Sequence, residues 1–309
     1  MFTDILLAIT PSEICQHAAD TAFAFAQKHN AKLRILNVCG LPTDGWGSIE
    51  HLIPSGEVNK IKTNIEAYYR EPISALGKNV TVEVVPGLPH SEILRISRKL
   101  DTDLIVMGPH NREHEEKRSK MWGMAGSTLE KVSQKARCPV MIVSRACPVA
   151  THGFSSLLVA TDFSEQAECA VGYSGQLARQ YKAKLTLLNV VDSEDLKRES
   201  VEKKISESKS RMEEAFASRL SGLDYHFEAW EGEPAMEILK MARVTNADLI
   251  IMAHHSKEMD PERAFLGSTV SQVALNASCP TISVNRHFDL RCGLVFDQHG
   301  GVVQAVAHG

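Results

Sequence analysis

The sequence lacks the features that direct a chain to a membrane, to secretion or to a nucleic acid. No apolar run approaches the roughly 18 residues that a membrane-spanning helix needs. The opening MFTDILLAIT carries Asp4 and has no basic segment before its apolar run, unlike a secretory signal. The formal net charge of −4 favours neither nucleic acid nor an acidic membrane surface as the main partner. We therefore expect a soluble cytoplasmic protein without a nucleic-acid partner or a membrane span.

The cysteines offer no disulfide framework. There are seven, an odd number, and no two of them form a CxxC pair. Cys138 and Cys279 each precede a proline at the start of a strand-like run, RCPVMIV and SCPTISV. We interpret them as buried thiols of a reducing compartment rather than as redox centres.

Catalytic and metal-binding patterns are also scarce. No spacing of Ser, His and Asp, or of paired carboxylates, brings reactive groups together, so the sequence makes no case for an enzyme. His110 and His114 lie four residues apart beside Glu113 and Glu115, which would suit zinc on a helix. Because a charged segment of this kind is more often a solvated surface, we predict no metal site.

What the chain does contain is an internal repeat. At a shift of 152 positions AKLRILNV (31–38) lies on AKLTLLNV (183–190), with six of eight residues identical. DLIVM (103–107) recurs as DLIIM (248–252) at a slightly smaller shift. Five blocks recur in the same order, which indicates a duplicated domain, and the changing shift places the length differences in loops.

Within each copy, short apolar runs alternate with helical patterns. Runs such as KLRILNV and DLIVM are rich in Ile, Leu and Val, as expected of strands buried on both faces. Ala235, Ile238, Leu239 and Ala242 follow helical spacing, and Pro234 stands where a first helical residue belongs. Strands joined by helices imply right-handed βαβ units. We therefore predict an α/β fold with two tandem open-sheet domains, each a five-stranded parallel sheet with four flanking helices.

The repeat also predicts domain boundaries. The first domain should span residues 1–144 and the second residues 155–286. Residues 287–309 form an extension in which CGLVF and VVQAVA read as a hairpin that would dock on a domain or on a second chain. The charged insertion 110–121 occurs in the first copy only, and the charged run 193–214 predicts the exposed face of a helix with i,i+4 ion pairs.

Three features stand out in these blocks: the T-D-x-S-E turn at 161–165, the fourth strand running into a loop, and the GST at 126–128 and 267–269 before each CP-containing fifth strand. Together they resemble the universal stress protein family in its tandem two-domain form. The resemblance implies an adenine-nucleotide α-hydrolase-like fold, dimerisation through the fifth strand, and ATP or another adenine nucleotide as ligand with Mg²⁺ as its companion. In ATP-binding members the acid after the first strand accepts a hydrogen bond from the adenine amino group. A G-x-x-G loop, followed after about nine residues by G-S/T, brings backbone N–H groups to the phosphates.

The first copy departs from this pattern. Thr10 stands where the acid belongs, and Asn111 stands at the second glycine position after Gly108. Pro109 removes a backbone donor from the loop, and 14 residues precede Gly126. We predict that this half does not bind ATP in the manner of the family.

The second copy keeps most of the implied site. Asp162 supplies the acid, whereas Ala253 and Ser256 replace the two glycines, and ten residues separate Ser256 from Gly267. Ala253 disfavours the positive φ of a tight phosphate turn, while Ser256 adds a hydroxyl donor. We predict that the adenine lies between the first and second strands and the phosphates at the loop. The predicted contacts are Ala160, Thr161, Asp162, Val190, Met252, Ala253, His255, Ser256, Gly267, Ser268 and Thr269.

Several alternatives stay open at this point. One is that the GST only starts a helix and that Asp162 caps the next one. For the whole chain, the leading hypothesis is a stress-response protein that binds a nucleotide and acts by conformation or through a protein partner. The others are an interaction module without a nucleotide and a slow ATP hydrolase. The fifth strands should lie at sheet edges, so we predict that the two copies pack as an intramolecular pseudo-dimer, with a homodimer as a further form.

Overall fold

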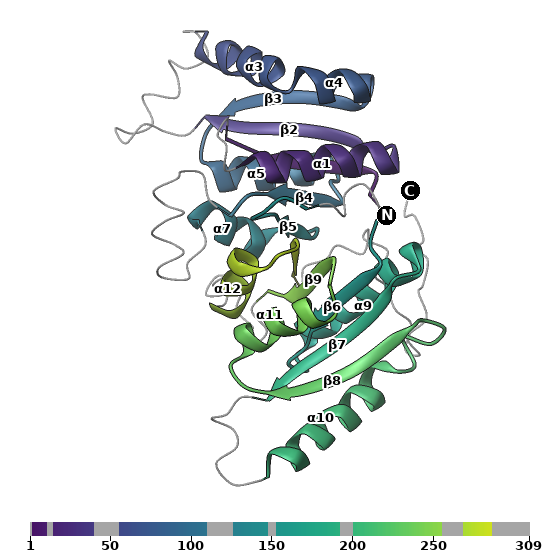
Figure 1. Cartoon of the computed structure of the whole chain (residues 1–309). Helices are drawn as coiled ribbons and strands as arrows, with labels where there is room; N and C mark the ends of the chain where they lie inside the picture. Colours follow the sequence, from purple (N-terminus) through teal and green to yellow (C-terminus); the bar gives the residue numbers. More distant parts are fainter. Residues whose placement is uncertain are drawn as a thin grey trace, which may run out of the picture.

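The computed structural model describes residues 2–10, 15–39, 56–109, 126–147, 153–191, 200–254 and 268–285, in which strands and helices alternate along the chain (Figure 1). The elements of the first half are β1 (Asp4–Ala8), α1 (Gln16–His29), β2 (Lys32–Cys39), α3 (Glu57–Tyr68), α4 (Arg70–Leu76), η3 (Gly77–Asn79), β3 (Val80–Pro86), α5 (Pro89–Lys99), β4 (Leu104–Met107), α7 (Ser127–Lys135) and β5 (Val140–Ile142). Those of the second half are β6 (Ser156–Ala160), α9 (Glu165–Tyr181), β7 (Lys184–Val191), α10 (Val201–Phe216), β8 (Tyr225–Glu231), α11 (Pro234–Val244), β9 (Leu249–Ala253), α12 (Ser268–Asn276) and β10 (Thr281–Val284).

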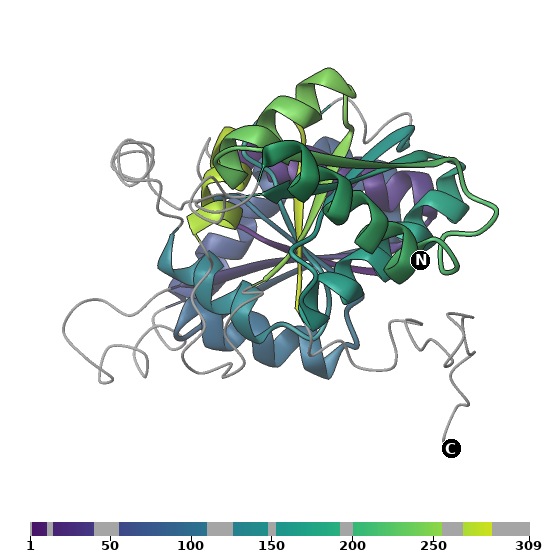
Figure 2. The same ribbon diagram turned by 90° about the horizontal axis from the view of Figure 1, so that it is seen from below.

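All ten strands form one sheet, in the order β3-β2-β1-β4-β5-β10-β9-β6-β7-β8. Within each half every strand pairs in parallel with its neighbours, which confirms the predicted α/β fold. The view along the sheet shows the strands fanning around a common axis, as a right-handed strand twist requires (Figure 2). The insertion 110–121 and the extension 287–309 lie outside the described residues.

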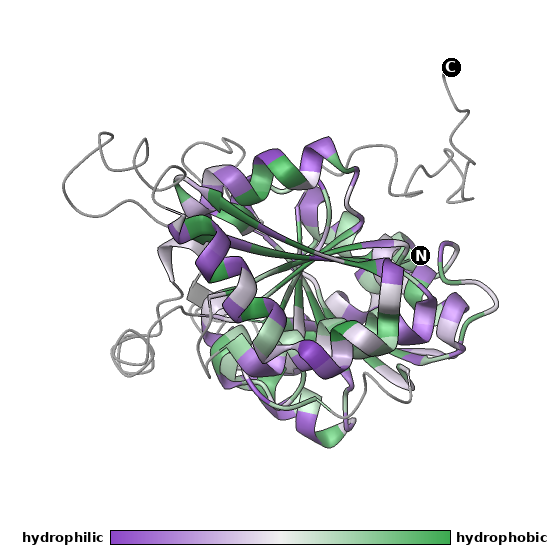
Figure 3. Cartoon of the chain, turned by 90° about the horizontal axis from the view of Figure 1, so that it is seen from above, coloured by the Kyte–Doolittle hydropathy of each residue, from purple (hydrophilic) through white to green (hydrophobic). Residues whose placement is uncertain are grey.

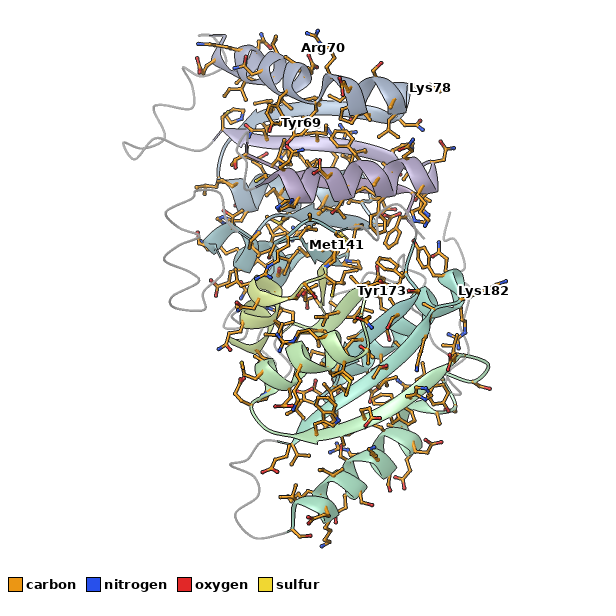
Figure 4. All side chains as sticks on the ribbon, in the orientation of Figure 1. Tyr69, Arg70, Lys78, Met141, Tyr173 and Lys182 are labelled. Atoms are coloured by element: carbon orange, nitrogen blue, oxygen red, sulfur yellow. The ribbon has the colours of Figure 1, made fainter. Side chains whose placement is uncertain are left out.

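The two halves join through their fifth strands. β5 and β10 pair antiparallel, with Met141 opposite Ile282. These two residues occupy the same position in the repeat, so the joint is centred on a pseudo-twofold axis, as in an isologous dimer. Met141 accordingly lies in the middle of the molecule (Figure 4). The predicted pairing of the fifth strands is confirmed. Because β5 and β10 are antiparallel, the carboxyl ends of β1–β5 point in the opposite direction to those of β6–β10.

Helices cover both faces of the sheet. One hydrophobic core runs through both halves beneath α1, α3, α9 and α10, whereas the opposite face has one core per half, beneath α5 and α7 and beneath α11 and α12. The alternation along β1 illustrates this division, since Leu7 faces the shared core and Leu6 faces the other. The central strands β4 and β9 are accordingly hydrophobic along their whole length, and hydrophobic colour gathers in the middle of the fold (Figure 3).

The helices agree with the sequence patterns except at one place. α11 begins at Pro234, and Ala235, Ile238 and Ala242 are buried. α10 begins inside the charged run, continues to Phe216 and carries the predicted i,i+4 pair, Lys203 with Glu207 at 3.6 Å. Between β2 and β3, however, two helices replace the single one that we expected. Their boundary lies at Tyr69, because Pro72 has no N–H to donate to the carbonyl four residues earlier.

Aromatic side chains reinforce the joint between the halves. The Tyr181 hydroxyl at the end of α9 lies 2.6 Å from Nε2 of His29 at the end of α1. The Phe154 ring contacts both Phe25 and Tyr181, at centroid distances of 5.5 and 4.9 Å. His29 and Tyr181 are equivalent positions of the repeat, separated by the same shift of 152 that relates Phe2 to Phe154. The joint therefore combines backbone pairing at its centre with a hydrogen-bonded aromatic cluster to one side.

Candidate functional site

The strand order identifies where a ligand would bind in each half. In the second half the chain proceeds from β6 outward to β7 and β8, and then returns to β9 on the other side of β6. In open parallel sheets, ligands occupy the crevice beyond the carboxyl ends of the strands at such a reversal. Ala160 and Met252 come directly after Val159 and Ile251, the last pair of residues between β6 and β9. The predicted residues of these two strands therefore lie together at this edge.

The turn that follows β6 holds Asp162 in an exposed position. Oδ1 of Asp162 accepts hydrogen bonds from the backbone N–H and the hydroxyl of Ser164, at 3.1 and 2.7 Å. The Ser164 hydroxyl oxygen in turn accepts from the N–H of Ala167 at 3.2 Å and caps α9. Ser164, and not Asp162, is therefore the cap, and the interpretation of Asp162 as a helix cap is wrong. The carboxylate closes an Asx turn and stays exposed at the edge of the sheet.

Backbone and buried side chains fix the residues on either side of Asp162. Thr161 is buried, and its Oγ1 accepts from the N–H of Phe163 at 3.1 Å. The Thr161 carbonyl accepts from Nδ2 of Asn189 at 2.8 Å, and Oδ1 of Asn189 accepts from the Ser208 hydroxyl at 2.8 Å. Our sequence analysis did not identify Asn189 as important. The signal was nevertheless present, because both copies of the repeat place an asparagine inside this apolar strand.

The first half repeats only part of this arrangement. Nδ2 of Asn37 donates to the Ile9 carbonyl at 2.9 Å, as Asn189 does to Thr161. At the position of Asp162, however, stands Thr10, whose hydroxyl lies 3.4 Å from Sγ of Cys15. In the loop after β4 the carbonyl of Pro109 accepts from Gly126 N–H at 3.0 Å. The carboxylate of the second half thus has no counterpart at this position.

The remaining predicted contacts divide into two groups. Ala160, Val190 and Ala253 are half-buried, Met252 is buried, and Thr269 lies half-buried in the first turn of α12. His255, Ser256, Gly267 and the side chain of Ser268 lie outside the described residues, so the predicted phosphate loop stays a prediction. The last described residue before it, His254, donates its N–H to the Val284 carbonyl at 2.7 Å, which joins β9 to β10.

Two further carboxylates belong to the opposite end of the strands. Oδ2 of Asp248, just before β9, accepts from the N–H and hydroxyl of Ser155, both at 2.6 Å, and from the N–H of Ser156 at 2.9 Å. Asp103 makes the equivalent three bonds at the start of β1. The Asp of the repeated DLI block therefore links the starts of neighbouring strands by hydrogen bonds, and its role is structural.

Neither a metal cluster nor a membrane span emerges from the part of the chain that the structure describes. Its residues contain no group of three or more His, Cys, Asp or Glu side chains arranged to hold a metal. His110, His114 and their neighbouring glutamates lie outside that part. Among the described helices, none is both long and apolar enough to cross a bilayer.

Comparison with known proteins gives consistent matches. The model of the universal stress protein family matches residues 1–144 and again residues 153–285. A universal stress protein of Methanocaldococcus jannaschii is 30% identical over 155 residues, which are 47% of this chain and 84% of that protein. The crystal structure of a universal stress protein from Archaeoglobus fulgidus matches with a TM-score of 0.66 and 21% identity, over 92% of this chain and 97% of that chain. A universal stress protein in complex with cAMP matches with 21% identity and a TM-score of 0.32, over 43% of this chain and 97% of that chain.

Proposed function

Because the chain belongs to the universal stress protein family, we propose that its second half binds an adenine nucleotide at the carboxyl ends of β6 and β9. The bound state is then transmitted by conformation or through a protein partner, and no chemical step is required. The observation that carries this proposal is the exposed Asp162 carboxylate, held on an ordered turn at the point where the strand order reverses.

The carboxylate retains the capacity that adenine recognition needs. An ionised carboxylate offers about four lone-pair positions, and Oδ1 of Asp162 accepts two hydrogen bonds from Ser164. Those two bonds fix the orientation of the group, because both donors belong to one residue of the same turn. The amino group of a purine ring is a neutral donor, and Oδ2 of Asp162 can accept a hydrogen bond from it. Mg²⁺ would accompany a nucleoside triphosphate at the loop.

The first half supplies a matched internal control. Thr10 stands at the equivalent position and carries a hydroxyl in contact with Cys15 instead of a carboxylate. Because the carboxyl ends of the strands point in opposite directions in the two halves, a substitution at one site leaves the surroundings of the other site unchanged. Ligand binding that depends on Asp162 and not on Thr10 would therefore assign the site to the second half.

The test combines detection of bound ligand with a titration. Mass spectrometry of the purified, denatured full chain should detect an adenine nucleotide, and calorimetry with ATP, ADP and cAMP in the presence of Mg²⁺ should rank them. Asp162→Ala removes a hydrogen bond to a charged acceptor, of about 1.5–3 kcal/mol, and should weaken binding roughly tenfold or more. Thr10→Ala should leave the affinity unchanged. Equal weakening by the two substitutions, or ligand bound only by the first half, would refute the assignment.

A second candidate function is an interaction module without a nucleotide. Ala253, at the end of β9, is the observation that favours it, because it replaces the glycine that lets a backbone approach phosphates. In that case the wild-type chain would release no nucleotide and would give no heat with any of the three ligands.

A further inference from the structure

Phe163, which follows Asp162, has an unusual backbone conformation. Its φ is +63°, in the left-handed region that L-residues with large side chains rarely adopt. Among the described residues, four others besides glycine have positive φ: Asn30, Asp101, Lys182 and Asn246. Each of those follows a helix C-terminus, where a left-handed residue is common. Phe163 instead precedes the N-terminus of α9, so its conformation needs a different cause.

Contacts from α10 hold the Phe163 ring. The ring is parallel to that of Phe216, with an interplanar angle of 4° and a centroid distance of 6.4 Å. The guanidinium carbon of Arg211 lies over the same ring, 4.1 Å from its centroid. Phe216 is buried and Arg211 is exposed, so α10 contacts the Phe163 ring through one core residue and one solvent-exposed residue. A strained residue persists only where its surroundings determine it, and here α10 provides them.

A second connection runs from α10 to the residue before Asp162. The buried Ser208 hydroxyl donates to Asn189, and Asn189 donates to the Thr161 carbonyl, both at 2.8 Å. Thr161 and Phe163, the two neighbours of Asp162 in the chain, are therefore both attached to α10. α10 itself lies against β7 and β8 at the outer end of the sheet (Figure 1).

We propose that α10 positions the Asp162 carboxylate and is the helix through which occupancy of the site is transmitted. This inference rests on the proposed function and adds its means of regulation. A ligand that shifts Asp162 also shifts its chain neighbours Thr161 and Phe163. Their contacts then carry this shift to α10: Thr161 through Asn189 to Ser208, and Phe163 through Arg211 and Phe216. Coupling between two sites is reciprocal, so weakening the α10 contacts must weaken ligand binding, and ligand binding must stabilise α10. Arg211 and Ser208 are positioning residues in this scheme, since they act through the turn.

Substitutions in α10 test this, at the exposed Arg211 and Lys209 and at the buried Ser208. Arg211→Ala removes the cation over the Phe163 ring and should weaken ATP binding about two- to fivefold, the range for an exposed cation–π contact. Arg211→Lys should restore part of the affinity. Ser208→Ala should weaken binding by at most about tenfold, the value of one hydrogen bond passed on in full. Lys209→Ala is the matched control, because it removes an exposed ion pair with Glu228 from the same helix and should change nothing at the site.

Hydrogen exchange of the full chain without nucleotide gives a second readout that does not depend on binding. The Phe163 and Ser164 amides should exchange faster in Arg211→Ala than in Lys209→Ala or the wild type. ATP should slow exchange along α10 in the wild type and do so less in Arg211→Ala. Unchanged exchange of the two turn amides in Arg211→Ala would overturn the coupling. If the wild type binds no nucleotide, the proposed function fails, while these amides still decide whether α10 controls the turn.

Discussion

We expect the buried position of His29, beside Tyr181 at the joint between the halves, to make the stability of the joint depend on pH. Burial lowers the pKa of His29 below its ordinary value of 6.5, and the charge of Lys28 lowers it further. A neutral imidazole can accept a hydrogen bond from the Tyr181 hydroxyl at Nε2, 2.6 Å away, whereas the Nε2–H of an imidazolium ion can only donate one. The rings of Phe2 and Phe25 pack against the imidazole and offer no polar group that could compensate its charge.

The sign of the effect follows from proton linkage. With a pKa lower in the folded than in the unfolded chain, His29 takes up its proton more readily when the chain unfolds. The stability due to neutral His29 is therefore fully present above pH 6.5 and is lost as the pH falls through the lower, folded-state pKa. Urea unfolding should give a smaller free energy of unfolding at about pH 5 than at about pH 8, where His29 is neutral in both states.

Two substitutions separate the contributions. Tyr181→Phe keeps the aromatic packing and removes one hydrogen bond, so the free energy of unfolding at about pH 8 should fall by about 0.5–1.5 kcal/mol. His29→Gln removes one group whose pKa is lowered and should reduce the pH dependence. His90→Gln is the comparison: burial, Lys131 and Lys135 also lower the pKa of His90, which lies in α5 away from the joint, so it should remove a separate part of the pH dependence. If His29→Gln kept the full wild-type pH dependence, or Tyr181→Phe had the wild-type stability, the reasoning would be refuted.

Three further outcomes follow from other contacts. Asp248→Ala removes three hydrogen bonds to one carboxylate oxygen, so the free energy of unfolding in urea should fall by about 2–3 kcal/mol. Calorimetry should show an unchanged ATP affinity, and a reduced affinity at full stability would contradict the structural role of Asp248. Ser164→Ala removes the cap of α9 and should lower the free energy of unfolding by about 1 kcal/mol. It should also weaken ATP binding, because Oδ1 of Asp162 loses its hydroxyl partner and keeps only the backbone N–H of residue 164; a stability loss alone would argue against the turn as a positioning device. Met141→Lys places a charge in the buried centre of the joint, and scanning calorimetry should show one transition lowered for the whole chain, whereas two separate transitions would mean that the halves unfold independently.

Much of the local structure was predictable because it depends on short stretches of chain. The repeat gave the order of strands and helices, since runs such as DLIVM and DLIIM can be buried only as central strands. Pro234 and the apolar spacing that follows it placed the start of α11 correctly. Asp162 stood out for a similar reason, because a T-D-x-S-E turn is a contiguous motif whose residues act within one turn.

Other features depend on residues that meet only in three dimensions. The resemblance pointed to pairing of the fifth strands, but nothing in VMI or TIS specifies the register that places Met141 opposite Ile282. Backbone N–H and C=O groups are the same in every residue, so they do not select one register. The alternative that Asp162 caps the helix stayed open in the sequence because Asp162 and Ser164 are both good caps, and the backbone path at Phe163 decides between them.

The sequence by itself determined the duplicated α/β architecture and the difference between a half with Asp162 and a half with Thr10. These follow from hydrophobic periodicity and from residue chemistry at single positions, which need no partner. Only the tertiary structure decided that α10 holds the turn around Asp162 and that His29 meets Tyr181 across the joint. Those contacts connect residues that lie far apart in the chain, and their energy comes from packing and hydrogen-bond geometry that exist only once the sheet has brought the helices together.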